Sequence, residues 1–141
     1  MIIEYSYLDE NNEIKFNVIK NVFDNIKGDV HPGYIRIRES LPGELQDSYM
    51  NFHNSIHKFH SINEKPAFII KNNNNEIFIK EYFKNGNHHR DDGPAIKYKY
   101  NFDFIGQYYL NSIWLDINKF AEKTSHLVCY HCNSFCKQKC F

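Results

Sequence analysis

The chain has 141 residues, a length typical of one domain, and its 17 basic and 17 acidic side chains give a formal net charge of zero. This balance excludes a global electrostatic field that would direct the protein to nucleic acid or to an anionic membrane, so such a partner would need a local patch. Aromatic residues make up 16% of the chain, which excludes a disordered protein and favours half-buried β-strands.

The N-terminal residues predict a β-hairpin followed by a short helix. Ile14, Phe16 and Val18 alternate with polar residues, and the polar run DENN separates them from an apolar first strand, IIEYSYL. Apolar residues between 19 and 26 then keep helical spacing and stop before Gly28, a frequent helix end.

A longer amphipathic helix is predicted over residues 42–58. Ser40 and Pro42 supply its start signals, and a strand, HPGYIRIR, is expected just before it. The apolar positions that recur at helical spacing are Leu45, Tyr49, Phe52, Ile56 and Phe59.

From residue 66 onward the pattern predicts a four-stranded antiparallel meander. Its strands are expected in PAFIIK, EIFIKEYFK, PAIKYKYNF and GQYYLNSIWL, separated by turn-forming polar residues. Asp116 is suited to cap a closing helix over residues 116–124.

The stretch NGNHHRDDGPA, residues 85–95, concentrates the titratable groups of the meander. Asn85, Gly86 and Gly93 suit turns with positive backbone dihedral angles. Arg90 lies beside acidic residues with which it can pair locally, and this explains the residue types without catalysis. The stretch therefore predicts a structured bend between two strands.

The same stretch supports a catalytic alternative. His89 would act as a general base, Asp92 would orient it and Arg90 would bind a phosphate, a set suited to a nuclease. We favour the structural interpretation, because a fainter copy, KFHSINEKPA at residues 58–67, keeps the histidine and the Pro-Ala exit but lacks the arginine and the glycine.

A third echo of the pattern, YYLNS at residues 108–112, matches YFKNG at residues 82–86. The sequence over about residues 57–123 thus resembles repeat proteins of phages and giant DNA viruses built on NG-x-x-HR-x-DGPA, which are similar to MORN-type repeats. The resemblance implies that each unit is a two-stranded β-hairpin and that the HR-x-DGPA segment links it to the next. It implies no enzymatic activity, and it covers neither residues 1–56 nor the C-terminal tail.

These patterns together predict an α+β fold with one domain over residues 1–126. Its N-terminal part, residues 1–60, is expected to provide a hairpin and helices that pack on an antiparallel β-meander of degenerate hairpin repeats over residues 61–115. The closing helix completes the domain, and a cysteine-rich tail occupies residues 127–141.

All four cysteines lie in this tail, with the spacing C-x2-C-x3-C-x3-C. In a reducing compartment such a cluster favours metal binding over a disulfide framework, and its compactness is similar to that of a zinc knuckle. The alternative is a helical stripe of small apolar side chains that pack against the sheet. The candidate zinc ligands are Cys129, Cys132, Cys136 and Cys140.

A second metal hypothesis concerns the predicted long helix. His53, His57 and His60 would share one stripe there, with a spacing that suits Zn²⁺ or Ni²⁺. We favour a histidine-rich exposed flank instead, because His60 belongs to the linker pattern and the sequence offers no obvious acidic fourth ligand.

Basic and aromatic residues are interleaved in the meander, as in sheets that bind single-stranded nucleic acid. Any sheet with one buried face shows the same alternation, and the zero net charge favours this plainer interpretation. The residues concerned are Lys65, Lys71, Lys80, Lys84, Arg90, Lys97 and Lys99, with Tyr82, Tyr98 and Tyr100 between them.

The function that we expect is that of a non-enzymatic binding module, a viral or phage accessory protein that engages a host or viral protein partner. Frequent Asn, Ile and Lys favour an AT-rich genome, and the absence of a long apolar run or a secretory signal favours the cytoplasm and no membrane. A nucleic-acid-binding protein with a zinc element is the first alternative, and a metal-dependent nuclease or hydrolase the second. The candidate binding residues are Asn85, His89, Arg90, Asp92, Tyr98 and Tyr100.

Overall fold

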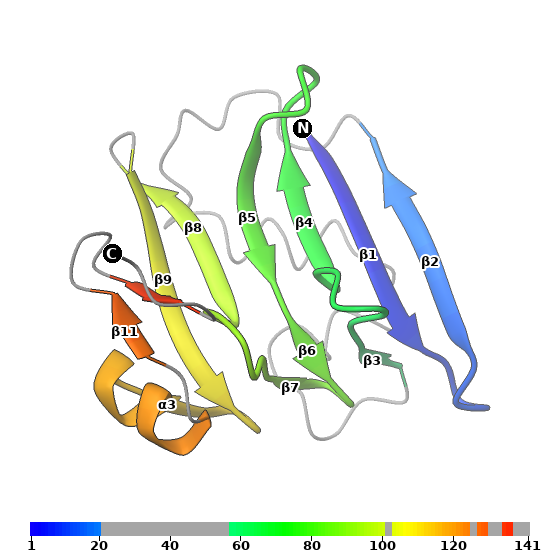
Figure 1. Cartoon of the computed structure of the whole chain (residues 1–141). Coiled ribbons are helices and arrows are strands. Elements are labelled where there is room, and N and C mark those ends of the chain that lie inside the picture. The colour runs from blue at the N-terminus through cyan, green and yellow to red at the C-terminus, as the bar shows by residue number, and fades with distance from the viewer. Residues whose placement is uncertain (21–56, 101–102, 125–126, 130–133, 137–141) are drawn as a thin grey trace.

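The structure is a computed structural model, and over the residues that it describes it shows antiparallel β-sheets with one short helix (Figure 1). The β-meander of the expected α+β fold is therefore present, whereas the packed helices of that expectation are represented here by this short helix alone. The described residues are 1–20, 57–100, 103–124, 127–129 and 134–136.

Eight strands form the main sheet. They are β1 (Ile2–Leu8), β2 (Ile14–Ile19), β3 (Lys58–Phe59), β4 (Phe68–Lys71), β5 (Ile77–Glu81), β8 (Ile96–Tyr100), β9 (Asp103–Leu110) and β10 (Ile113–Leu115). Seven of them follow the order β10-β9-β8-β5-β4-β1-β2, and β3 pairs with the C-terminal end of β1. Strands from distant parts of the sequence thus lie in one layer (Figure 1).

Two small sheets and a helix complete the described fold. β6 (Phe83–Lys84) and β7 (Asn87–His88) form a short hairpin between β5 and β8. α3 (Ile117–Thr124) follows β10, and β11 (Leu127–Cys129) pairs with β12 (Ser134–Cys136).

The expected N-terminal hairpin is confirmed as β1 and β2. Its turn is held by the Asp9 carboxylate, whose Oδ1 accepts hydrogen bonds from the amides of Asn11 and Glu13 at 2.9 and 3.0 Å. The bond from the Glu13 amide is the main cause that lowers the pKa of Asp9 below its ordinary value. The side chain of Asn72 accepts two amides in the same way in the turn between β4 and β5.

The expected meander is confirmed in β4, β5, β8 and β9, each antiparallel to the next. β1 pairs with β4 and so joins the N-terminal hairpin to the same sheet, which the sequence did not indicate. The register sets Ile3 opposite Ile70, and Ile70 opposite Ile79. This row of apolar residues across the strands explains why the hairpin adds to the meander.

The predicted helices have different outcomes. Lys58 and Phe59 form β3 and pair with β1, so the expected helical end at residue 58 was wrong. The rest of that helix, residues 42–56, lies outside the described residues, as do HPGYIRIR and most of the shorter helix before it. Ile19, with which that shorter helix was expected to begin, belongs to β2.

The closing helix is confirmed as α3. The Asp116 side chain accepts a hydrogen bond from the amide of Lys119 at 2.9 Å, as the predicted cap requires. Phe120 is fully buried and packs on Tyr108 of β9 with ring centroids 4.9 Å apart. This contact holds the helix against the end of the meander.

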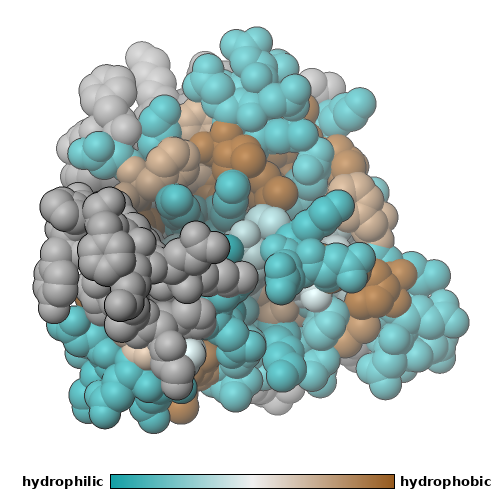
Figure 2. Space-filling view, viewed as in Figure 1, coloured by the Kyte–Doolittle hydropathy of each residue, from teal (hydrophilic) through white to brown (hydrophobic). Residues whose placement is uncertain are grey.

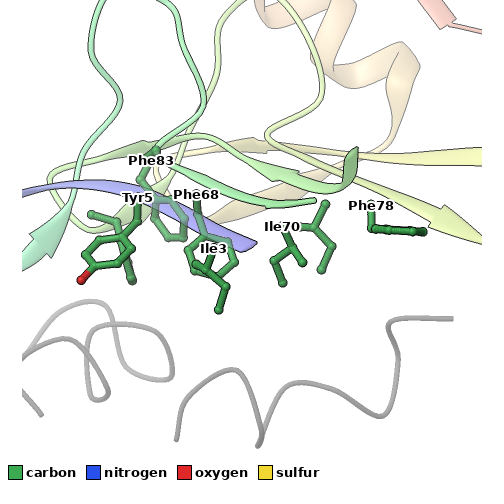
Figure 3. Close-up of a cluster of buried hydrophobic side chains, with 9 residues drawn as sticks. Ile3, Tyr5, Phe68, Ile70, Phe78 and Phe83 are labelled. Atoms are coloured by element: carbon green, nitrogen blue, oxygen red, sulfur yellow. The ribbon is translucent and has the colours of Figure 1, made fainter. Parts of the chain in front are cut away.

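The main hydrophobic core lies on one side of the sheet. Figure 3 shows Ile3, Tyr5, Phe68 and Ile70 projecting from the same side, as alternate residues of a strand do. The buried cluster consists of Ile3, Tyr5, Phe59, Ala67, Phe68, Ile70, Phe78, Ile79 and Phe83.

The other side of the sheet carries more polar side chains. Glu4 and Lys71 form an ion pair at 2.7 Å across β1 and β4. Figure 2 shows hydrophobic side chains in separate patches among hydrophilic ones. Large apolar side chains are exposed on both outer strands, Phe16 at 65% and Trp114 at 59%. Over the described ranges, no helix is long and apolar enough to cross a membrane.

Candidate functional site

Two links of the chain connect successive strands at the same end of the sheet (Figure 1). The first link, residues 60–67, joins β3 to β4, and the second link, residues 89–95, joins β7 to β8. Side chains of both links line one pocket, so the links lie side by side. The second link contains the HRDDGPA part of the motif, and the first contains its fainter copy.

The strand before each link accepts a hydrogen bond from the turn of the following hairpin. The carbonyl oxygen of Phe59 accepts from the amide of Gly86 at 2.9 Å. In the same way, the carbonyl oxygen of His88 accepts from the amide of Ser112 at 2.9 Å. The two contacts are equivalent, and they dock each turn onto the strand that precedes it in the chain.

A histidine begins each link and contacts the same following turn. His60 Nδ1 accepts a hydrogen bond from the Asn85 amide at 3.1 Å, and His89 Nδ1 accepts one from the Asn111 amide at 3.0 Å. Both contacts require a ring that is unprotonated at Nδ1 and carries its proton on Nε2. Burial, and secondarily the charge of Lys84, lowers the pKa of His60 and so favours this neutral form.

The links also end alike. The amide of Ser6 donates to the carbonyl oxygen of Ala67 at 2.8 Å, and the amide of Tyr82 donates to that of Ala95 at 2.7 Å. Both alanines are fully buried, which leaves no room for a larger side chain at the Pro-Ala exit. The exit therefore fixes where the next strand enters the sheet.

Arg90 forms a clamp inside the second link. Its Nε donates to Asp92 Oδ1 at 2.9 Å, its Nη1 donates to the Pro94 carbonyl at 3.4 Å, and its guanidinium lies 4.0 Å from the centre of the Tyr82 ring. A Cβ at Gly93 would lie 2.7 Å from Arg90 Cζ. The positive φ expected at Gly93 was wrong, and what distinguishes this position is the guanidinium of Arg90, which a Cβ there would displace.

Both ring nitrogens of His89 have polar neighbours within the chain, and Nδ1 is the one that forms a hydrogen bond. Nδ1 accepts from the Asn111 amide, and Nε2 lies 3.0 Å from Asp91 Oδ1. The expected orientation of His89 by Asp92 was wrong, because Asp92 pairs with Arg90 instead. Without a free nitrogen, His89 has no lone pair with which to accept a proton from a substrate.

A buried Glu81–His88 pair lies next to the links and was missed in the sequence. Glu81 Oε1 is 3.0 Å from His88 Nε2, and the two side chains are only 3% and 10% exposed. Glu81 Oε2 has no hydrogen-bond partner among the residues that the structure describes. The His88 ring packs on Phe83 and Tyr109, with centroids 4.2 and 5.4 Å apart. Burial is the main cause that raises the pKa of Tyr109.

The pocket between the links has a volume of about 530 Å³. Both links and the segment between them contribute to its lining, which includes the rings of Tyr82 and Phe83. Its polar side chains are His60, Ser61 and Glu64 of the first link, His89, Arg90, Asp91 and Asp92 of the second, and Lys84 of β6.

Of the three histidines expected to share a helical stripe, the structure describes His57 and His60, and these two do not form such a stripe. His57 stacks on Tyr7, with ring centroids 5.1 Å apart, and its Nε2 lies 2.7 Å from Glu10 Oε2. His60 belongs to the first link, and His53 lies outside the described residues. Over the described part of the chain, no three His, Cys, Asp or Glu side chains are grouped so that they could hold a metal ion.

The cysteine tail is described only in part. Cys129 ends β11 and Cys136 ends β12, so the alternative of a helical stripe was wrong for these two residues. Cys132 and Cys140 lie outside the described residues, and zinc binding by the four cysteines stays a prediction.

The tyrosines expected to bind a partner lie away from the links. Tyr98 packs against the main core, and Tyr100 ends β8 opposite Asp103. Of the basic residues, Lys97 lies 5.2 Å from the ring centre of Phe104, and Lys71 is paired as described above. Lys80 lies opposite Lys97 on the neighbouring strand, and Lys99 lies 5.8 Å from the ring centre of Phe78. Lys97 and Lys99 therefore lie beside phenylalanines, whereas Tyr98 packs on the core.

Comparison with known proteins identifies no relative, since no family model, no curated protein and no solved structure matches the chain. The candidate site therefore has to be interpreted from its own geometry.

Several pocket residues were missed by sequence reasoning. His60, Ser61 and Lys84 come together with the motif because the first link lies beside the second. The signal was present in the fainter copy, since KFHS aligned on NHHR sets His60 at the position of His89 and Ser61 at that of Arg90. The sequence pattern assigned His60 only to a metal hypothesis and Lys84 only to a basic sheet, so it did not predict a pocket shared by the two links.

Proposed function

We propose that the protein is a non-enzymatic binding module that engages a protein partner through the two links and the pocket between them. The observation that carries this proposal is a pocket of about 530 Å³ at the end of a hydrogen-bonded sheet, lined by charged, polar and aromatic side chains. Pockets that bind ligands commonly have volumes of about 300 to 1,000 Å³, and loops on a rigid scaffold are common recognition surfaces.

The contacts of the second link support a role without catalysis. The Nδ1 of His89 accepts the Asn111 amide while its Nε2 lies 3.0 Å from Asp91 Oδ1, and Arg90 is held by Asp92 and by the Tyr82 ring. These are the groups that a metal-dependent nuclease or hydrolase would have to present to its substrate. Their bonds within the chain favour a structural role for them and leave recognition to the pocket.

The recurring contacts also support a repeat relationship of the kind that the NG-x-x-HR-x-DGPA resemblance implies. Leu8 pairs with Lys58 in β1 and β3 as Lys84 pairs with Asn87 in β6 and β7. On this comparison β1 and β3 correspond to β6 and β7, and β1 belongs to the first of three degenerate hairpin units. On this basis we propose a viral or phage accessory protein of the host cytoplasm.

A peptide library displayed on phage, with the full chain as bait, tests the binding proposal. We expect enrichment of related peptides that bind the wild type and Lys15→Glu, a charge reversal on the exposed part of β2, but not Lys84→Glu in the pocket. Thermal unfolding checks that both variants are folded. Equal binding to Lys84→Glu, or no enrichment at all, would contradict the proposal, as would a hydrolytic activity that is lost in His89→Ala.

A further inference from the structure

The pocket between the links presents hydrogen-bond donors that are not used within the described chain. His60 accepts at Nδ1, so its Nε2 carries a proton, and Ser61 Oγ accepts from the Phe83 amide, so its own proton remains available. Nη2 of Arg90 and the ammonium of Lys84 have no hydrogen-bond partner in the part of the chain that the structure describes.

The acceptors of the pocket are already engaged or lie at its rim. Asp92 pairs with Arg90 Nε, and Asp91 pairs with His89 Nε2 while its side chain is 78% exposed. Glu64 is also exposed. A ligand in the pocket therefore has to supply the hydrogen-bond acceptors for these donors.

We propose that the pocket binds a single carboxylate side chain, an Asp or Glu of the protein partner, an inference that rests on the proposed function. A carboxylate offers two oxygens with about four acceptor positions, which can take donors from Arg90, Lys84 and Ser61, all of which line the pocket. Charge-assisted hydrogen bonds of this kind are stronger than neutral ones, and arginine edges suit the planar geometry of the group.

The charges at the rim favour one carboxylate over a polyanion. Three carboxylates line the pocket, those of Glu64, Asp91 and Asp92, against the two positive charges of Lys84 and Arg90, and Asp92 is already paired with Arg90 Nε. A nucleic-acid backbone, or a run of acidic residues, would bring further phosphates or carboxylates against this rim, where like charges repel. An isolated acidic side chain can reach the donors without that repulsion.

Chemical-shift titration of the ¹⁵N-labelled full chain tests the carboxylate. The probes are a blocked Gly-Ser-Glu-Ser-Gly peptide, its Gln counterpart, inorganic phosphate and a short single-stranded oligonucleotide. We expect the Glu peptide to shift the His60 ring and Arg90 side-chain signals at lower concentration than the Gln peptide does. Lys84→Gln should weaken this binding about tenfold, because a hydrogen bond to a charged group is lost. Lys97→Gln, on β8, should leave it unchanged.

The outcomes separate this inference from the function on which it rests. The carboxylate proposal is overturned if the Glu and Gln peptides bind equally, or if the Glu peptide binds the wild type and Lys84→Gln equally. The same holds if phosphate or the oligonucleotide shifts these signals at lower concentration than the Glu peptide. A different outcome is a displayed library that yields peptides that lack acidic residues but still need Lys84 for binding. In that case the carboxylate proposal is wrong and the proposal of a binding module stands.

Discussion

Residues 60–67 and residues 89–95 connect successive hairpins at the same end of the sheet, yet only the second link contains an arginine clamp. Both links begin with a histidine that accepts a turn amide, and both end with a buried alanine that accepts a strand amide. Ser61 stands where the second link has Arg90, and Lys65 stands where it has Gly93. The backbone path therefore needs the histidine and the Pro-Ala exit, whereas the clamp is additional.

The difference extends into the sheet. Tyr5 and Phe59 meet edge to face at 6.2 Å before the first link, and Glu81 and His88 occupy the equivalent positions before the second. One unit thus fills this place with an aromatic pair and the other with a buried polar pair. A buried polar pair is tolerated only while both partners are present. If one partner is removed, the other is left buried without a hydrogen bond, and this destabilises the fold.

The largest expected effect on stability comes from replacing the polar pair of the second unit by the aromatic pair of the first. His88→Phe alone should lower the free energy of unfolding by about 3–5 kcal/mol, because Glu81 loses its partner in a buried site. The double variant Glu81→Tyr with His88→Phe should recover most of the loss, since it recreates the aromatic pair. Denaturant unfolding of the two single variants and the double variant measures the coupling.

Additive losses in the double variant would contradict the equivalence of the two pairs. The matched control is Tyr5→Glu, which introduces into the first unit the carboxylate that Glu81 provides in the second. It should destabilise strongly, because a carboxylate would then be buried against Phe59 without a partner.

A smaller effect is expected where the clamp touches the backbone. Gly93→Ala should cost about 1 kcal/mol, because its Cβ would lie 2.7 Å from Arg90 Cζ and would displace the guanidinium from its contacts with Asp92 and Tyr82. Lys65→Ala, the equivalent change in the first link, should change stability by less than about 0.5 kcal/mol, because the Lys65 side chain is exposed. Thermal or denaturant unfolding compares the two variants directly.

The clamp itself can be removed as a check. In an Arg90→Ala background, Gly93→Ala should cost much less than in the wild type, because the clashing atoms are gone. An unchanged cost would show that the glycine is required by the backbone alone, and the account of the clamp would be wrong.

The parts of the fold that follow from local patterns were predictable. Ile96 and Tyr98 alternate with lysines, and this period of two identified β8 without its neighbours. Asp116 before an apolar-periodic run identified α3, because a cap and its helix are adjacent in sequence. Each of these signals lies within a few residues of the structure that it predicts.

The parts that depend on distant partners were not predictable in this way. Phe59 fits the spacing of a helix, but it pairs with Tyr7, a partner far away in the chain. The side-chain pairing in the second link was likewise open, because Asp91 and Asp92 are adjacent carboxylates. The direction of the link decides that the first reaches His89 and the second reaches Arg90.

The smallest expected effect concerns pH and the first link. Burial lowers the pKa of His60 below its value in the unfolded chain, so the unfolded state binds the proton more readily. The contribution of His60 to stability is therefore fully present above the unfolded pKa of about 6.5 and is lost as the pH falls through the lower folded pKa. Protonation at Nδ1 also removes the acceptor of the Asn85 amide.

His60→Asn separates this effect from other titrating groups, because its amide oxygen can accept the same hydrogen bond at any pH in this range. Between pH 7 and pH 5 the carboxylates of ordinary pKa stay ionised, so we expect the wild type to lose more stability than the variant over this interval. Urea unfolding at both pH values measures the difference. If the two proteins lose the same amount, the Asn85 contact does not depend on a neutral His60, and the histidine serves the first link by its shape alone.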